Sequence, residues 1–218
     1  QFEPSLFHGT TPVLRPEGKD YHLTSDLVDH SITWLRSQQS LTPDKPFLLY
    51  LATGGIHAPI QVPGSYIEKY RGKFDQGWDA LRSEIFARQK KLGAIPKSTK
   101  LTPRPDGMPA WESLTVDQKR FASRSMEAYA GFLDHTDAQI GRLVDELKAS
   151  GQFDNTLFVY IVGDNGASAE GTLDGSINYI AKFTGLPEPE SVRTAGIDRI
   201  GGPDSYAHIP AAWAWANN

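Results

Sequence analysis

The segment 154–171 constrains the fold of this chain more than any other stretch. After a turn signal at Asp154-Asn155, an apolar run rich in β-branched and aromatic residues extends over 157–162. Such a run between turn residues is typical of a strand that is buried on both faces of a parallel sheet. It stops at Gly-Asp-Asn-Gly in positions 163–166, where the glycines allow the backbone to turn sharply. The sequence therefore predicts an α/β fold with polar side chains at the carboxyl end of a central strand.

Asp164 and Asn165 are the polar residues at that strand end. In open α/β sheets, ligands bind beyond the carboxyl ends of the strands. A carboxylate beside a carboxamide offers the hard oxygen ligands that Ca²⁺ and Mg²⁺ prefer. The same residues are also ordinary turn formers, so the spacing alone leaves open a metal site and a structural turn.

A second apolar run, 47–52, follows Pro46 and predicts another buried strand. It ends in a loop that contains Gly54, Gly55 and then His57. This repeats the pattern of a strand, glycines and a polar group. A single histidine at a strand end fits either a hydrogen-bonded loop residue or a catalytic group.

Helices are expected between and around these strands. Thr24 or Ser25 can cap a helix that runs to about Gln39. A short helix is expected at 66–70, and an amphipathic one at 77–92 with Arg82 on its outer side.

The longest expected helix begins at 115–118, which has the form of a capping box, and runs to about Ala149 before Gly151. A helix followed directly by a buried strand is half of a crossover unit. Asp134, His135 and Asp137 lie on this helix. Capping, solvation or tertiary hydrogen bonds explain them better than a metal site.

The remaining stretches are expected to be irregular. Residues 1–23 carry no strand pattern, 93–114 form a proline-rich loop, and 172–218 form an irregular C-terminal stretch with a short helix at 176–183. A loop as long as 93–114 is unusual in a compact domain and is often functional, although a solvated excursion is an equal alternative.

Composition excludes several classes of protein. The 218 residues are enough for one domain with a sizeable core. A net charge of -4 argues against nucleic acid as a partner, because a nucleic-acid binder needs a basic face. No apolar run approaches the roughly 20 residues of a membrane span. The absence of cysteine excludes disulfides and thiolate metal sites.

Four segments together resemble a bacterial arylsulfatase, a type I sulfatase of the alkaline phosphatase superfamily. They are 46–59 with its His-Ala-Pro, 74–89 with Phe-Asp-Gln-Gly-Trp-Asp, the helix 129–147, and 155–171 with Gly-Asp-Asn-Gly-Ala-Ser-Ala-Glu-Gly. The resemblance covers most of the chain from about Tyr21 onward. It implies an alkaline-phosphatase-like sandwich, with a mostly parallel central sheet flanked by helices, that is incomplete here.

The resemblance also implies roles for three residues. Asp164 and Asn165 match the pair that binds Ca²⁺ in that family, and His57 matches the histidine that contacts the sulfate ester and protonates the leaving oxygen. A divalent cation neutralises the ester, and imidazole titrates near neutrality, so it can deliver a proton. The implied activity is arylsulfatase hydrolysis of a small-molecule sulfate ester.

The sequence departs from the family in more than one respect. The family nucleophile is a formylglycine made from Cys or Ser within Cys/Ser-x-Pro/Ala-x-Arg, and neither version occurs here. The family's other two calcium carboxylates, which lie upstream, are missing too. Residues 1–218 are therefore interpreted as an internal segment of a sulfatase catalytic domain, with the formylglycine expected upstream.

Two alternatives stay open. One is a phosphoesterase or phosphonate hydrolase of the same superfamily, which Asn165 disfavours because the resembling phosphatases place a histidine there for a transition metal. The other is a truncated, non-catalytic α/β binding module. The compartment, bacterial cytoplasm or periplasm, also stays open.

The isolated 218-residue chain is expected to hydrolyse no sulfate ester, because it lacks the nucleophile motif and two of the four usual calcium ligands. The measurement is turnover of an aryl sulfate by the purified chain, with a His57→Ala variant as the background control. Turnover above that background would contradict the expectation.

Overall fold

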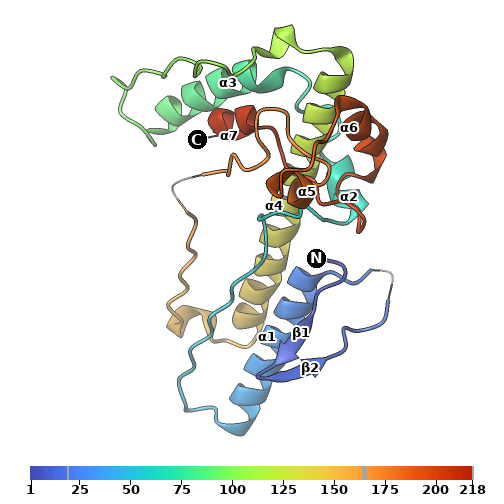
Figure 1. Ribbon diagram of the computed structural model, residues 1–218. Helices are drawn as coiled ribbons and strands as arrows, with labels where there is room; N and C mark the ends of the chain where they lie inside the picture. Colours follow the sequence, from blue (N-terminus) through green and yellow to red (C-terminus); the bar gives the residue numbers. More distant parts are fainter. Residues whose placement is uncertain (19, 164–165, 218) are drawn as a thin grey trace.

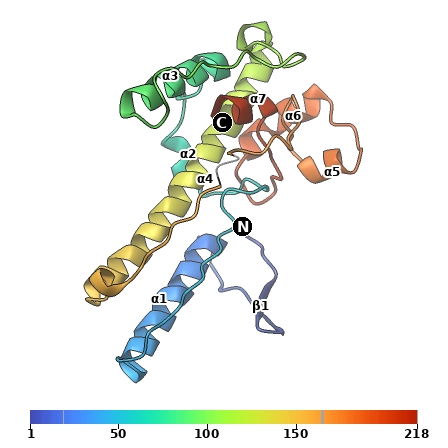
Figure 2. The same cartoon turned by 90° about the vertical axis from the view of Figure 1, so that its left-hand side faces the viewer.

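Helix α4 (Val116–Ala149) is the axis around which the other elements are arranged (Figures 1 and 2). The structure, a computed structural model, describes residues 1–18, 20–163 and 166–217. The predicted capping box is confirmed: the Thr115 hydroxyl accepts from the Gln118 N–H at 3.2 Å, and the Gln118 side chain accepts from the Thr115 N–H at 3.0 Å. At the other end Gly151 has φ 71°, a conformation that favours glycine and stops the helix.

The other elements lie on either side of this axis. They are β1 (Leu6–His8), β2 (Thr11–Val13), α1 (Leu23–Leu41), α2 (Gly64–Glu68), α3 (Gly77–Leu92), η1 (Trp111–Ser113), η2 (Phe153–Asn155), α5 (Tyr179–Phe183), α6 (Glu190–Gly196), η3 (Ile197–Arg199) and α7 (Ala211–Asn217). Helix α3 has the predicted bounds, and α1, α2 and α5 lie close to theirs.

The larger core surrounds the N-terminal half of α4, where α2, α6 and η3 contact it and α3 contacts α7. Trp213 of α7 lies at its centre with no exposed surface. Its indole N–H donates to the Ala122 carbonyl at 2.9 Å. Its ring meets those of Phe74, Trp78 and Trp111 at centroid distances of 5.7, 5.5 and 5.7 Å. Aromatic side chains with a satisfied polar group give large buried area at little polar cost, so this cluster fastens α7 and α3 to α4.

The smaller core joins α1 to the C-terminal half of α4. It contains Val28 and Leu35 from α1 and Leu143 and Leu147 from α4. The cap of α1 differs from the prediction: His22 is the N-cap, and its Nδ1 accepts from the Thr24 N–H at 3.2 Å. The capping function therefore belongs to a residue two positions before the expected cap, because the side chain of Thr24 is itself buried.

The segment 47–52 differs from the predicted buried strand. It pairs with no strand among the described residues, and only one of its faces is covered. Phe47, Leu49 and Leu51 pack against the smaller core, whereas Leu48 and Tyr50 are 90% and 87% exposed. Covered and exposed side chains alternate because successive side chains of an extended backbone point to opposite faces.

The segment 157–162 differs even more. Its six side chains are exposed, from 37% at Phe158 to 89% at Leu157. Burial on both faces needs neighbouring strands and covering layers. Within the described residues, the regular sheet consists of the β1–β2 hairpin, in which Leu6 pairs with Val13 and His8 with Thr11. The described chain is thus a mixed helix and strand structure, and it contains no central parallel sheet.

Three further differences concern stretches expected to be irregular or exposed. Residues 1–23 contain the β1–β2 hairpin, and 172–218 contain α6, η3 and α7 in addition to the expected short helix. Arg82 is buried rather than outward, since its guanidinium lies 4.4 Å from the Trp215 ring centre and donates to the Trp215 carbonyl and to Thr102. A long arginine side chain can cover an aromatic face in this way.

No helix in the described ranges has both the length and the apolar character needed to cross a bilayer.

Candidate functional site

His57 lies in the loop that follows the extended segment 47–52, and its side chain is exposed. The loop is held by a hydrogen bond from the His57 N–H to the Gly54 carbonyl at 3.0 Å. Gly55 lies against α4 so closely that a Cβ there would collide with the Thr136 hydroxyl. The His57 Nδ1 lies 2.8 Å from the Ala58 carbonyl oxygen, to which it donates as N–H. Nε2 is therefore the ring atom left to exchange a proton.

Asp164 and Asn165, the expected metal ligands, lie outside the described residues. Within the described ranges, no group of three or more His, Cys, Asp or Glu side chains is arranged to hold a metal ion. Close downstream, Ala167 packs against the larger core and the Glu170 N–H bonds to the Ser168 hydroxyl at 3.2 Å. The assignment of Asp164 and Asn165 as ligands thus stays a prediction.

A histidine that the sequence did not single out lies beside this segment. His208 is 4% exposed, and its Nε2 lies 3.9 Å from the carboxylate of Glu170. Its Nδ1 donates to the Ile209 carbonyl at 3.2 Å. Burial lowers the pKa of His208, although the bond to the Ile209 carbonyl and the nearby Glu170 carboxylate act in the opposite direction. The ordinary sequence Tyr-Ala-His-Ile-Pro at 206–210 gave no signal for this contact.

The backbone explains why these residues meet. The Ile60 N–H donates to the Ala207 carbonyl at 3.3 Å, which brings the loop after His57 against the segment before His208. On the other side, a Cβ at Gly171 would collide with the Ile209 carbonyl and lie 2.9 Å from the His208 Nδ1. Only glycine therefore allows the chain after Glu170 to approach so closely.

His22 and His135 form a second histidine pair, away from His57. Both rings are buried, and their centroids are 4.3 Å apart. The His22 Nε2 donates to the Gln61 carbonyl at 3.1 Å, and the His135 Nε2 lies 3.3 Å from the Ser25 hydroxyl. Burial lowers the pKa of each ring to about 4. His135 thus makes the tertiary contacts that were expected of it.

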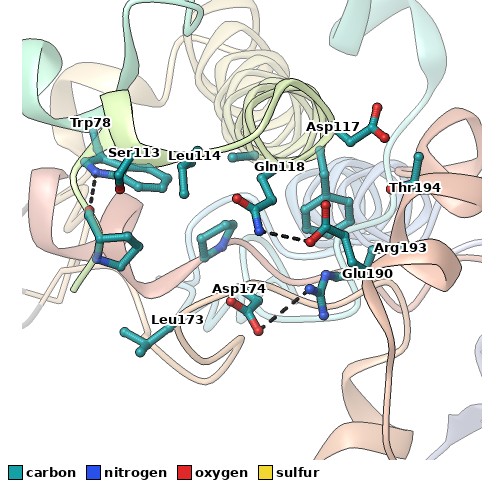
Figure 3. Close-up of a pocket in the computed structure, with 14 residues that line it drawn as sticks. Trp78, Ser113, Leu114, Asp117, Gln118, Leu173, Asp174, Glu190, Arg193 and Thr194 are labelled. Atoms are coloured by element: carbon teal, nitrogen blue, oxygen red, sulfur yellow. Dashed lines mark hydrogen bonds and ion pairs between the residues drawn. The ribbon is translucent and has the colours of Figure 1, made fainter. Parts of the chain in front are cut away.

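A cavity of about 200 Å³ lies between the start of α4 and α6 (Figure 3). Trp78, Leu114 and Leu173 supply part of its apolar wall. Four of its polar side chains are paired with one another: Gln118 donates to Glu190 at 2.9 Å, and Arg193 pairs with Asp174 at 3.7 Å. His57 does not line it, so we do not take this cavity as the candidate site.

A comparison with models of known protein families shows to which family the chain belongs. The family model described as "Sulfatase" matches residues 3–201. The chain belongs to the sulfatase family.

Three relatives are similar to this sulfatase chain. An uncharacterized sulfatase of Schizosaccharomyces pombe is 33% identical over 99% of the chain and 37% of that protein. An arylsulfatase of Klebsiella aerogenes is 29% identical over 91% of the chain and 40% of that protein. An arylsulfatase of Clostridium perfringens is 27% identical over 83% of the chain and 33% of that protein. The sulfatase chain thus spans 40% or less of the length of each of these relatives.

The buried His22–His135 pair predicts a pH-dependent stability of the sulfatase chain. In the unfolded state each ring takes up a proton near its ordinary pKa of 6.5, whereas the folded state resists until about pH 4. The free energy of unfolding should therefore fall as pH decreases from about 6.5 to about 4, by on the order of 3 kcal/mol for each ring.

Urea unfolding at several pH values measures this effect. His135→Gln should flatten the dependence on pH, because glutamine cannot be protonated in this range. The matched control is His30→Gln, since the side chain of His30 is 78% exposed. An unchanged pH dependence in His135→Gln would show that this ring is not the group responsible.

Proposed function

We propose that the protein containing this chain is an arylsulfatase, which hydrolyses sulfate esters of phenols or alcohols. Membership of the sulfatase family supports hydrolysis at the level of the reaction class. The names of the relatives from Klebsiella aerogenes and Clostridium perfringens, at 29% and 27% identity, support the aryl ester as the substrate class.

The observation that carries the proposal is the state of His57. Its Nδ1 is fixed by the Ala58 carbonyl, its Nε2 is unengaged by that bond, and the ring is exposed at the end of an extended segment. A general acid needs one nitrogen held in place and the other directed to the reacting oxygen. This arrangement also distinguishes His57 from His22, which is buried and uses both ring nitrogens in hydrogen bonds.

The chemistry of sulfate ester hydrolysis explains why such a group is required. Cleavage of the ester S–O bond leaves an alkoxide or phenoxide, and an alkoxide is a poor leaving group unless it receives a proton. The Nε2 of protonated His57 would supply this proton as the bond breaks. The released product is then the neutral alcohol or phenol.

Asp164 and Asn165 are proposed as part of a Ca²⁺ site. Their donor chemistry fits, because both offer hard oxygens and their neighbours in the sequence, 162–168, include neither cysteine nor histidine. Bound there, the cation would neutralise the negative charge of the ester. Two protein oxygens fall short of the six to eight that Ca²⁺ takes, so further ligands must come from elsewhere.

The proposal extends to the parts of the fold and site that this chain lacks. We infer that 47–52 and 157–162 are strands of an alkaline-phosphatase-like parallel sheet in the longer protein. The apolar side chains that stay exposed, Leu48 and Tyr50 in the first segment and all six in the second, support this. The formylglycine nucleophile is proposed to belong to a part of the protein outside these 218 residues.

The His57 assignment is tested by the dependence of turnover on the leaving group in the full-length protein. His57→Gln should lower kcat for an alkyl sulfate by roughly 10²- to 10⁴-fold, the usual contribution of a general acid. The loss should be much smaller for 4-nitrophenyl sulfate, whose leaving group needs little protonation. His30→Gln, on the exposed side of α1, is the control. Equal losses on both esters would contradict an acid role.

The metal assignment is tested by calorimetric titration of the full-length apoprotein with Ca²⁺. Asp164→Asn should weaken binding at least about tenfold, because affinity for a hard cation follows the number of charged ligands. Asp154→Asn is a matched control, since Asp154 is an exposed residue of η2. If Asp164→Asn bound Ca²⁺ as tightly as the wild type, Asp164 would not be a ligand.

A further inference from the structure

The end of helix α3 and the loop after it form a strongly basic stretch. Between Glu84 and Asp106 the sequence contains no Asp or Glu, although the whole chain has a net charge of -4. Five cations lie within 88–100, and we call their side chains the basic end: Arg88, Lys90, Lys91, Lys97 and Lys100. Such a local excess of one charge, against the sign of the whole chain, favours an anionic partner.

The fold brings both parts of the basic end to one tip of the molecule. Helix α3 ends at Gly93, and the loop then turns back and runs beside the helix toward η1 (Figures 1 and 2). The Arg82 guanidinium donates to the Thr102 hydroxyl at 2.8 Å, and Arg104 donates to Asp79 at 2.6 Å. These bonds fix the returning loop along α3, so the lysines of the loop lie at the same tip as the last turn of the helix.

The cations of the basic end lack acidic partners. Four of the five side chains are exposed, and the fifth, Lys90, lies 4.5 Å from the ring centre of Phe86. Within residues 1–18, 20–163 and 166–217, no carboxylate forms an ion pair with any of them. Arg88 and Lys91 also lie at i and i+3 of the helix, a spacing at which like charges destabilise it. A bound anion would relieve this repulsion.

A structural explanation accounts for only part of this charge. Lys90 and Lys91 lie in the last turn of α3, where cations interact favourably with the helix dipole. Lys97 and Lys100 lie beyond the helix, and the dipole does not explain them. The loop that carries them is stiffened by prolines, which reduces the entropy lost when a partner binds.

The chemistry of the basic end favours a flexible sulfated polymer over other polyanions. Residues 87–110 contain no aromatic side chain on which a nucleic-acid base could stack. The apolar side of α3 is already buried, with the Trp78 ring 5.5 Å from that of Trp213, so it is not free to enter a bilayer. Four of the five cations are lysines, and an ammonium group is a point charge that accepts an anion from any direction.

We propose that the basic end is an attachment surface for sulfated polysaccharides. It lies apart from His57, because the loop before His57 packs against Thr136 in the second half of α4, whereas α3 contacts α7 and η1. A polymer that carries sulfate groups along its length can occupy both places. Attachment at the basic end then raises the effective concentration of its other sulfate esters near His57. This inference rests on the proposed function, in which sulfate esters are the substrates.

The test measures binding of the full-length protein to immobilised dextran sulfate at several salt concentrations. Lys97→Gln/Lys100→Gln should weaken binding roughly ten- to thirtyfold at low salt, since one lysine near an anionic surface accounts for about fivefold. The slope of log affinity against log salt should shrink by about two, because two contacts no longer release counterions. Lys97→Arg/Lys100→Arg keeps both charges and should bind within about twofold of the wild type.

The matched control is Lys45→Gln/Lys148→Gln, which removes the same charge from two exposed lysines outside the basic end. It should change affinity by less than about twofold, because contacts at the basic end are kept. Equal losses in the two Gln variants, or no loss in either, would overturn the attachment surface. Tighter binding of single-stranded DNA than of dextran sulfate at the same salt would overturn the class of partner.

Turnover of 4-nitrophenyl sulfate by the wild type separates this inference from the proposed function. If Lys97→Gln/Lys100→Gln alone loses dextran sulfate but the wild type hydrolyses no aryl sulfate, the attachment surface stands and the arylsulfatase assignment fails. If the wild type hydrolyses the ester and all variants bind the polymer alike, the arylsulfatase assignment stands and the attachment surface fails.

Discussion

The burial of Trp213 against α4 is the interaction on which the arrangement of the larger core depends. Its indole hydrogen bond to Ala122 and its contacts with Phe74, Trp78 and Trp111 join three segments that are far apart in sequence. Fully burying an aromatic side chain of this size contributes about 3 kcal/mol or more to the free energy of unfolding. This is a large share of the net stability of a domain. The same fastening holds the segment that leads into α7, so the position of His208 follows from it.

Helices were predictable because their signals are local. The capping box at Thr115, the helical stripe of α4 and the stop at Gly151 each depend on residues within a few positions, and each is present in the structure. The β1–β2 hairpin and α7 were missed for opposite reasons. The hairpin is mostly exposed and carries little apolar alternation, whereas α7 is nearly all buried and has no polar face to reveal its period.

The two predicted strands show what an apolar run in the sequence cannot predict, namely whether its side chains are buried. The apolar run 157–162 indicates side chains that favour removal from water, but neighbouring strands must complete the sheet and helices must cover its faces before they are buried. Those neighbours are absent from the described residues, so the backbone is extended while the side chains stay exposed. The candidate site divides in the same way. His57 could be found because a strand end has a recognisable form, whereas His208 reaches it through long-range backbone contacts that no local pattern encodes.

The proposed sheet and the proposed metal site both require further strands from the rest of the protein. In the sequence, His57 follows 47–52 and Asp164 follows 157–162, and both of these segments carry exposed apolar side chains. Strands that paired in parallel with these two segments would bring their own carboxyl ends, and the residues after them, to the same edge, while the helices between them covered Leu48 and Ile161. Burial of the apolar faces and completion of the ligand set would then be one event. Loss of a neighbouring strand should accordingly lower both the stability of the fold and the affinity of the proposed site for Ca²⁺, since both depend on the same neighbours.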